Sequence, residues 1–96
     1  MNPANPIILD LTNCKYADEI HLRIKDTFGF PDYYGMNWDA MWDCVRYYFR
    51  KTETCAIQVK GIQTLSENLI EYCDPMWDVL RDLQEARSGI TFSVVE

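Results

Sequence analysis

Two aspartates and two tryptophans alternate within one short segment of this 96-residue chain. Asp39 and Asp43 are four residues apart, and so are Trp38 and Trp42. Residues at this spacing lie on the same side of an α-helix, so two carboxylates would point the same way beside aromatic rings. An exposed pair of like charges repels by a few tenths of a kcal/mol, and the fold gains nothing evident from the second charge. Such a pair is typical of a surface that binds cationic groups.

The residues around this pair are acidic and aromatic. Between Lys25 and Arg46 there are four aspartates and no lysine or arginine, and nine of the thirteen aromatic residues lie between Phe28 and Phe49. Bulky apolar groups and negative charge together suit a basic partner. The alternative interpretation is an ordinary solvated helix face, on which Asp39 would gain about 0.3–1 kcal/mol from the helix N-terminus.

Aromatic residues of this segment divide between a predicted core and a predicted surface. Tyr33 and Tyr34 are adjacent in a turn and cannot readily both point inward, and Trp42 is flanked on its helix face by charged residues, so these three are candidate contact residues. His21 is interpreted as a surface helix residue without a role. A core stripe is predicted from apolar residues at three- and four-residue spacing: Trp38, Met41, Val45, Tyr48 and Phe49.

Length and composition indicate one globular domain spanning residues 1–96. Hydrophobic residues make up 48% and charged residues 25%, and no apolar run approaches the roughly 18 residues of a membrane-spanning helix. A net charge of −6 disfavours direct binding to nucleic acid, because phosphates would be repelled. The N-terminal residues lack the pattern of a secretory signal, so a cytoplasmic location is expected.

The residues that would build a metal or catalytic site are scarce. The four cysteines are scattered without a Cys-x-x-Cys pair, and a single histidine is present, so reduced thiols are expected and no zinc site is predicted. Asp39 and Asp43, even with Asp32, supply too few oxygens for a hard cation and lack a nearby catalytic partner. We therefore expect no cofactor, no metal and no enzymatic activity.

The predicted elements alternate in the order β-α-α-β-α-α-β. Gly29 ends the first helix, Gly35 is expected to supply a positive φ in the next turn, and Asn37 is placed to cap the second helix. Because this order favours right-handed crossovers, it predicts an α/β fold with a small three-stranded parallel sheet and about four helices packed against it. The expected strands are 6–11, 55–60 and 90–95; the expected helices are 18–28, 38–50, a short one near 65–70, and one that starts with Asp74 as N-cap and Pro75 and ends before Ser88 and Gly89.

The sixteen residues from Phe30 to Val45, FPDYYGMNWDAMWDCV, resemble the signature of the barstar family of ribonuclease inhibitors. That signature is an apolar residue, Pro-Asp/Glu-Tyr-Tyr-Gly-x-Asn-x-Asp-Ala, an apolar residue, then Trp-Asp-Cys and an apolar residue. The chain has every fixed residue of this pattern. The order of elements also matches the barstar-like layering of strands and helices, whereas outside the motif the likeness is only topological.

This resemblance implies an intracellular inhibitor, monomeric when free, that protects the cell's own RNA as an immunity protein does. It would plug the active site of a small basic ribonuclease with the second helix and the preceding turn, whose acids imitate RNA phosphate. Asp43 would enter the phosphate-binding pocket, and Asp39 would pair with a cation near the guanine-recognition loop. An acid on the last helix is a further contact, mapped to Asp82, with Glu85 or Asp78 as alternatives. The residues implied to surround the two acids are Tyr33, Asn37, Trp38 and Trp42.

The identity of the partner and the inhibition itself are left open by the sequence. The family's helix often continues after the motif with small residues where this chain has Tyr47 and Tyr48, which favours a different cognate enzyme. The alternative function is a barstar-like binding module that docks another basic protein without inhibiting a nuclease.

Overall fold

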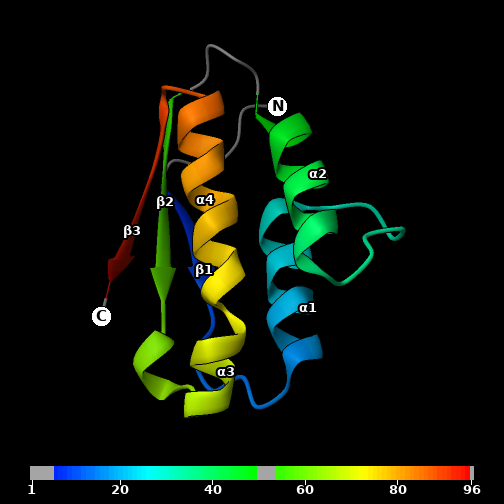
Figure 1. Cartoon of the computed structure of the whole chain (residues 1–96), viewed down its shortest axis with the longest axis vertical. Coiled ribbons are helices and arrows are strands. Elements are labelled where there is room, and N and C mark those ends of the chain that lie inside the picture. Colours follow the sequence, from blue (N-terminus) through cyan, green and yellow to red (C-terminus); the bar gives the residue numbers. More distant parts are fainter. Residues whose placement is uncertain (1–5, 50–53, 96) are drawn as a thin grey trace.

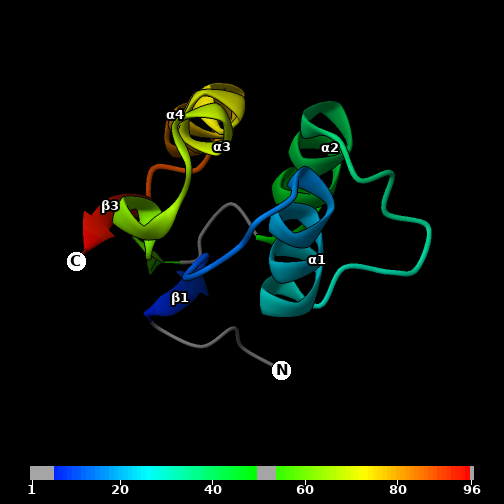
Figure 2. The ribbon, with the colours of Figure 1, turned by 90° about the horizontal axis from the view of Figure 1, so that it is seen from below.

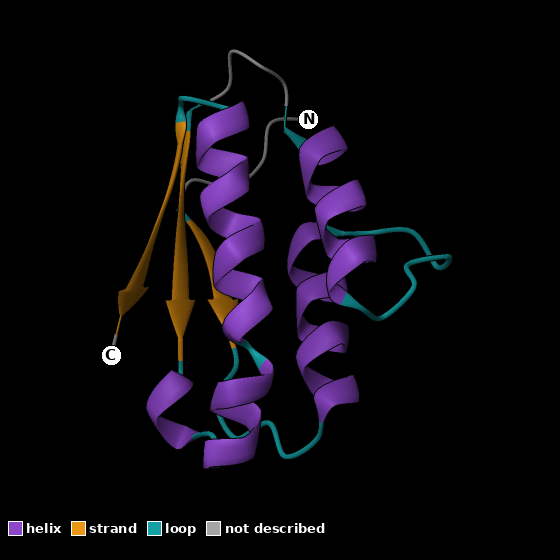
Figure 3. Ribbon diagram, in the orientation of Figure 1, coloured by secondary structure: helices purple, strands orange, loops and turns teal. Residues whose placement is uncertain are grey.

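A three-stranded parallel sheet carries all the helices on one face. The computed structural model describes residues 6–49 and 54–95. Its strands are β1 (Ile7–Asp10), β2 (Cys55–Lys60) and β3 (Ile90–Val95), and β2 lies between the other two (Figures 1 and 3). Both strand pairs are parallel, with Ile57 opposite Ile7 on one side and Phe92 on the other. The predicted sheet is therefore confirmed.

Four α-helices cover the sheet, in agreement with the predicted number. Figure 2, seen from below, shows the helices on one side of the strands, with α3 and α4 at one end of the layer and α1 and α2 at the other. Among the described helices, none is both long and apolar enough to cross a membrane. The helices are α1 (Ala17–Phe28), α2 (Trp38–Tyr48), α3 (Glu67–Tyr72) and α4 (Asp74–Ala86), with a 3₁₀ turn η1 (Ile62–Thr64) before α3.

The observed bounds of the elements differ from the expected ones by a few residues at the ends of individual elements. Strands β2 and β3 begin and end as predicted, while β1 is shorter, although Leu11 still donates a 2.8 Å main-chain hydrogen bond to Lys60. Helix α2 ends at Tyr48 rather than continuing to Arg50. The cations Arg50 and Lys51, which the expected helix 38–50 would place at its C-terminus, lie outside the described residues.

The junction of α3 and α4 corrects another expectation. Asp74 is not the N-cap: it is the first residue of α4, and the single residue Cys73 separates the two helices. Cys73 keeps a right-handed helical conformation, with φ −79° and ψ −4°. An N-cap side chain works from an extended residue, so the uninterrupted turn leaves no such position for Asp74.

The core lies between the sheet and the helices. Alternate residues of β1 and β2, such as Leu9, Ile57 and Val59, point into it, and α1, α2 and α4 add apolar side chains. Burial of these side chains is the main favourable contribution to folding. All four cysteines are free, as expected, and burial raises the pKa of the Cys73 thiol to about 11, so this thiol stays protonated.

Candidate functional site

The turn between α1 and α2 has a fixed conformation. Gly29 ends α1 with a positive φ of 70°, as predicted, and the main-chain N–H of Tyr34 donates a 2.9 Å hydrogen bond to the carbonyl of Pro31. The positive φ expected at Gly35 is instead found at Met36, with 55°. Gly35 is needed for space, since a Cβ there would lie 3.2 Å from the Cβ of Ala40. The turn thus packs tightly against the first turn of α2.

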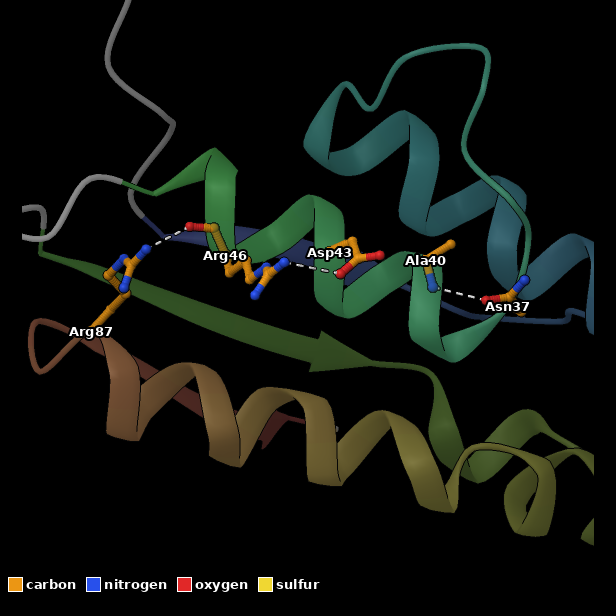
Figure 4. A network of polar contacts seen from close by, with 5 residues as sticks. All are labelled: Asn37, Ala40, Asp43, Arg46 and Arg87. Atoms are coloured by element: carbon orange, nitrogen blue, oxygen red, sulfur yellow. Dashed lines mark hydrogen bonds and ion pairs between the residues drawn. The ribbon is translucent and has the colours of Figure 1, made fainter.

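Asn37 caps α2, as the sequence predicted. Its Oδ1 accepts a 2.8 Å hydrogen bond from the main-chain N–H of Ala40 (Figure 4). Its Nδ2 donates a 3.0 Å hydrogen bond to the carbonyl of Gly35. Both ends of the amide are therefore engaged within the protein. The cap sets where the helix starts, and with it the direction of the side chains that follow.

His21 is buried, which corrects its interpretation as a surface residue. Only 1% of it is exposed, and its Nδ1 and Nε2 each lie 2.8 Å from a phenol oxygen, those of Tyr34 and Tyr72 respectively. Burial lowers the pKa of His21 and raises the pKa of Tyr34. The spacing of His21 with Ile24 and Phe28 places all three on one helix face, and this signal could have identified it.

Trp38 completes this buried cluster at the start of α2. Its ring centroid lies 4.5 Å from that of His21 and 5.2 Å from that of Tyr72. Tyr34 points inward, whereas its neighbour Tyr33 is 84% exposed, so the two tyrosines do not both point inward, as expected. The interpretation of Tyr34 as a candidate contact residue is wrong, because only 5% of it is exposed. Trp38 therefore anchors the start of α2 against His21 and Tyr72, and Tyr33 is free to contact another molecule.

The outer side of α2 presents the two acids. Asp39 is exposed and makes no hydrogen bond or ion pair with any other described residue. Asp43 is also exposed, and its Oδ1 lies 3.3 Å from Nη2 of Arg46, one turn further along the helix. Lys25 similarly pairs with Asp32 at 3.0 Å. Part of the negative charge that the sequence suggested to be unpaired is therefore compensated within the protein. The two cations, Lys25 and Arg46, are the residues that directly flank the stretch without lysine or arginine.

Arg46 and Arg87 connect the end of α2 to its surroundings. The guanidinium carbon of Arg46 lies 4.9 Å from the ring centroid of Tyr47 and 5.9 Å from that of Trp42. Arg87, the residue that follows α4, donates hydrogen bonds to the carbonyls of Arg46 (2.7 Å) and Phe49 (3.2 Å), as Figure 4 shows for the first. Because the last carbonyls of a helix lack partners within it, these bonds hold the C-terminus of α2 against α4.

A pocket of about 450 Å³ opens beside Asp43. Tyr33 contributes from the turn, and Arg46 and Tyr47 contribute from the second half of α2. Its walls thus combine aromatic rings, one carboxylate and one guanidinium. The complete lining is Gly29, Phe30, Pro31, Tyr33, Asp43, Cys44, Arg46, Tyr47 and Tyr48.

Asp82 lies on α4, the helix beside α2 in Figure 1, and is exposed. Trp77 stacks on Phe92, and Gln84 accepts a hydrogen bond from the N–H of Phe92, so these two residues face β3. At 100° per residue, Asp82 lies about 150° around the helix from both and so on the side of α4 nearer α2. It makes no hydrogen bond or ion pair to α2 within the described ranges.

The arrangement can bind cationic groups. Asp39 and Asp43 are held on a helix whose two ends are fixed by Asn37 and Arg87, and charged acceptors form the stronger class of hydrogen bonds. Within residues 6–49 and 54–95, no group of three or more histidine, cysteine or acidic side chains could hold a metal ion. The exposed carboxylates of α2 can accept hydrogen bonds from cationic groups of a partner.

Comparison with known proteins identifies the family of this chain. A model of the family described as "Barstar (barnase inhibitor)" matches residues 4–96, a range that contains α2 and the preceding turn. The chain is also 33% identical over 79 residues to a protein of Bacillus subtilis (strain 168) named "Putative ribonuclease inhibitor YrdF", covering 82% of this chain and 85% of that one. With its parallel sheet and its capped acidic helix, this chain belongs to the barstar family, whose members are binding proteins and not enzymes.

Proposed function

We propose that this protein inhibits a small basic ribonuclease of the barnase type by inserting α2 and the preceding turn into the active site. Membership of the barstar family supports the class of partner. The observation that carries the proposal is the pair Asp39 and Asp43, both exposed on one side of a helix that Asn37 caps. These carboxylates imitate RNA phosphates, and Asp43 takes the central place among the cations of the enzyme.

Rigidity makes this pair effective. A carboxylate that is already fixed on a helix can form charge-assisted hydrogen bonds without losing conformational freedom on binding. Tyr33, with 84% of its surface exposed, and the half-buried Trp42 provide apolar contact area next to the acids. The exposed Asn37 and the half-buried Trp38 stand beside the acids as further contact residues, and their hydrogen bonds and packing also position the acids.

Asp82 extends the proposed contact surface onto α4. It is exposed and lies on the side of that helix nearer α2. A cation of the ribonuclease outside the active-site centre would pair with it. Loss of this rim contact would reduce affinity less than loss of Asp43, because rim charges are screened by water and salt.

The proposed setting is the cytoplasm, where such an inhibitor protects the RNA of the cell that contains it. The net charge of −6 speeds encounter with a basic enzyme and keeps the inhibitor away from RNA itself. We propose that the free protein is a monomer, since the acidic face would repel a second copy of itself.

The test is a titration of barnase and other small basic ribonucleases with the purified protein, using hydrolysis of a fluorescent RNA substrate as the readout. Stoichiometric one-to-one loss of activity is expected for at least one enzyme. Binding to a ribonuclease that leaves its activity intact would contradict inhibition and favour a docking module for basic proteins. Absence of binding to every enzyme of the panel would overturn the proposal.

A further inference from the structure

Arg46 occupies the position that a partner's cation would take beside Asp43. Its Nη2 is 3.3 Å from Oδ1 of Asp43, within the range of an ion pair between separate molecules. We infer that Arg46 is a built-in competitor of the acidic site: it neutralises Asp43 in the free protein and must be displaced when a cationic group of the ribonuclease binds there. This inference rests on the proposed function of Asp43.

The surroundings of Arg46 resemble a binding site for a guanidinium. Its charged end lies over the ring of Tyr47 at 4.9 Å and near the ring of Trp42 at 5.9 Å, distances at which aromatic faces attract cations. An arginine from a partner would find the same carboxylate and the same rings. Tyr33 also lines the pocket beside Asp43 and offers a further ring.

Arg46 is also held in a way that permits its release. Its side chain is 40% exposed, and the ion pair spans one turn of an exposed helix face, an arrangement that contributes only about 0.2–1 kcal/mol. Its Nε is buried and has no hydrogen-bond partner within the part of the chain that is described. A buried donor without an acceptor is unfavourable, so the bound position of Arg46 is not an optimal one.

A competitor of this kind makes the site selective. A protein with a single surface lysine or arginine would only exchange one cation for another and gain little. An active site in which several cations converge gains more than Arg46 contributes, because each added cation interacts with the released carboxylate. Arg46 therefore lowers the affinity for basic proteins in general, whereas an active site that binds phosphate through several cations is still bound tightly.

The experiment measures dissociation constants for barnase, or for the most strongly inhibited enzyme of the panel, at 150 mM salt. The variant Arg46→Gln keeps a good helix former and removes the charge. We expect it to bind about threefold to tenfold more tightly than the wild type, because an intramolecular pair and a repulsion against the partner's cations are both removed. Arg46→Lys, which retains the charge, should stay within about twofold of the wild type.

Two controls separate competition from a general effect of charge. Lys15→Gln removes one positive charge from an exposed position before α1 that does not line the pocket beside Asp43, and should change the dissociation constant by less than about 1.5-fold because salt screens an exposed charge. Arg46→Gln combined with Asp43→Asn should gain less over Asp43→Asn alone than Arg46→Gln gains over the wild type, because only the repulsion against the partner's cations is then relieved. Equal gains for Arg46→Gln and Lys15→Gln would contradict a local role.

The outcomes distinguish this inference from the proposed function. If the wild type binds and Arg46→Gln binds equally well or more weakly, the proposed function stands and the competitor role is overturned, with Arg46 then acting as a contact or a support. If neither protein binds any ribonuclease of the panel, both are overturned. Circular dichroism and urea unfolding of Arg46→Gln exclude a loss of folding as the cause of weaker binding.

Discussion

Nδ1 of His21 lies 2.8 Å from the hydroxyl oxygen of Tyr34, and this buried hydrogen bond ties α1 to the turn before α2. The other ring nitrogen lies 2.8 Å from the hydroxyl oxygen of Tyr72 in α3. One imidazole therefore joins three segments beneath the acidic helix. Its ring also packs against Trp38, the first residue of α2. The placement of α2 depends on this residue.

Stability should fall as the pH decreases below the ordinary histidine pKa of 6.5, because burial lowers the pKa of His21 in the folded protein. In that range the unfolded chain binds a proton that the folded chain does not, so protons favour unfolding. The nearby charge of Asp18 opposes this shift but is the smaller cause. Urea unfolding at pH 7.5, 6.5 and 5.5 measures the free energy of unfolding.

The variant His21→Gln provides the comparison for that measurement. Its neutral amide does not titrate, so its free energy of unfolding should change less between pH 7.5 and 5.5, even though the variant is less stable throughout. Identical pH dependence in the two proteins would show that His21 is not the group responsible.

Replacing Asp43 by alanine should weaken inhibition more than any other single change on α2. Removing one partner from a buried charge pair at an interface costs about 2–5 kcal/mol, because the partner's cations stay buried without a counter-charge. Asp39→Ala should have the next largest effect. The exposed Glu71 on α3 serves as a control, and its replacement by alanine should leave inhibition constants within about twofold, as for a screened distant charge.

The same Asp43→Ala variant should unfold with a nearly unchanged free energy. Loss of the exposed pair with Arg46 and relief of repulsion from Asp39 have opposite signs, and each amounts to a few tenths of a kcal/mol. A variant that loses stability together with inhibition would instead indicate a structural role for Asp43.

Asn37→Ala should lower the free energy of unfolding by about 0.5–2 kcal/mol, since α2 loses the side-chain acceptor for the N–H of Ala40. Asn37→Asp retains that acceptor and should be milder. Asn68 is an exposed asparagine in the first turn of α3 that is not a cap, so Asn68→Ala should change stability by less than about 0.5 kcal/mol. Equal losses at the two asparagines would contradict the capping role of Asn37.

Arg87→Met should loosen the last turn of α2. The variant keeps much of the apolar length of the side chain but removes the donors to the carbonyls of Arg46 and Phe49, which should cost about 1–3 kcal/mol. Hydrogen exchange of the amide of Phe49, which bonds to the carbonyl of Val45, should become faster. Unchanged exchange at this amide would show that Arg87 does not stabilise the helix end.

Local signals in the sequence were sufficient for the elements and for the start of α2. The strands β2 and β3 are short apolar runs bounded by turn residues, and Asn37 lies directly before a stretch with helical periodicity, so each depends on neighbouring residues alone. The placement of both acids on one side of α2 could also be predicted, because it depends only on their four-residue spacing.

Of the features that were missed, one depends on distant parts of the chain and two depend on residues nearby. The spacing of His21 with Ile24 and Phe28 could have shown that it is buried, but not that Tyr34 and Tyr72 approach its ring from two other segments. The ion pair between Asp43 and Arg46 was missed because the acidic stretch was counted up to Arg46 and the i,i+3 neighbour just beyond it was not paired with Asp43. Glycine at position 35 was expected for a positive φ, but it is required there because its backbone lies close to the side chain of Ala40.

The hydrogen bonds from Arg87 to α2 have a consequence for the order of events during protein synthesis. The residues of the turn and of α2 leave the ribosome in the first half of the chain, whereas Arg87 and the edge strand β3 are among the last ten residues. A nascent chain that ends before Arg87 has the acids of α2 but not the donors that hold the end of this helix. The end of α2 therefore gains these two hydrogen bonds only after the segment that contains Arg87 has been synthesised.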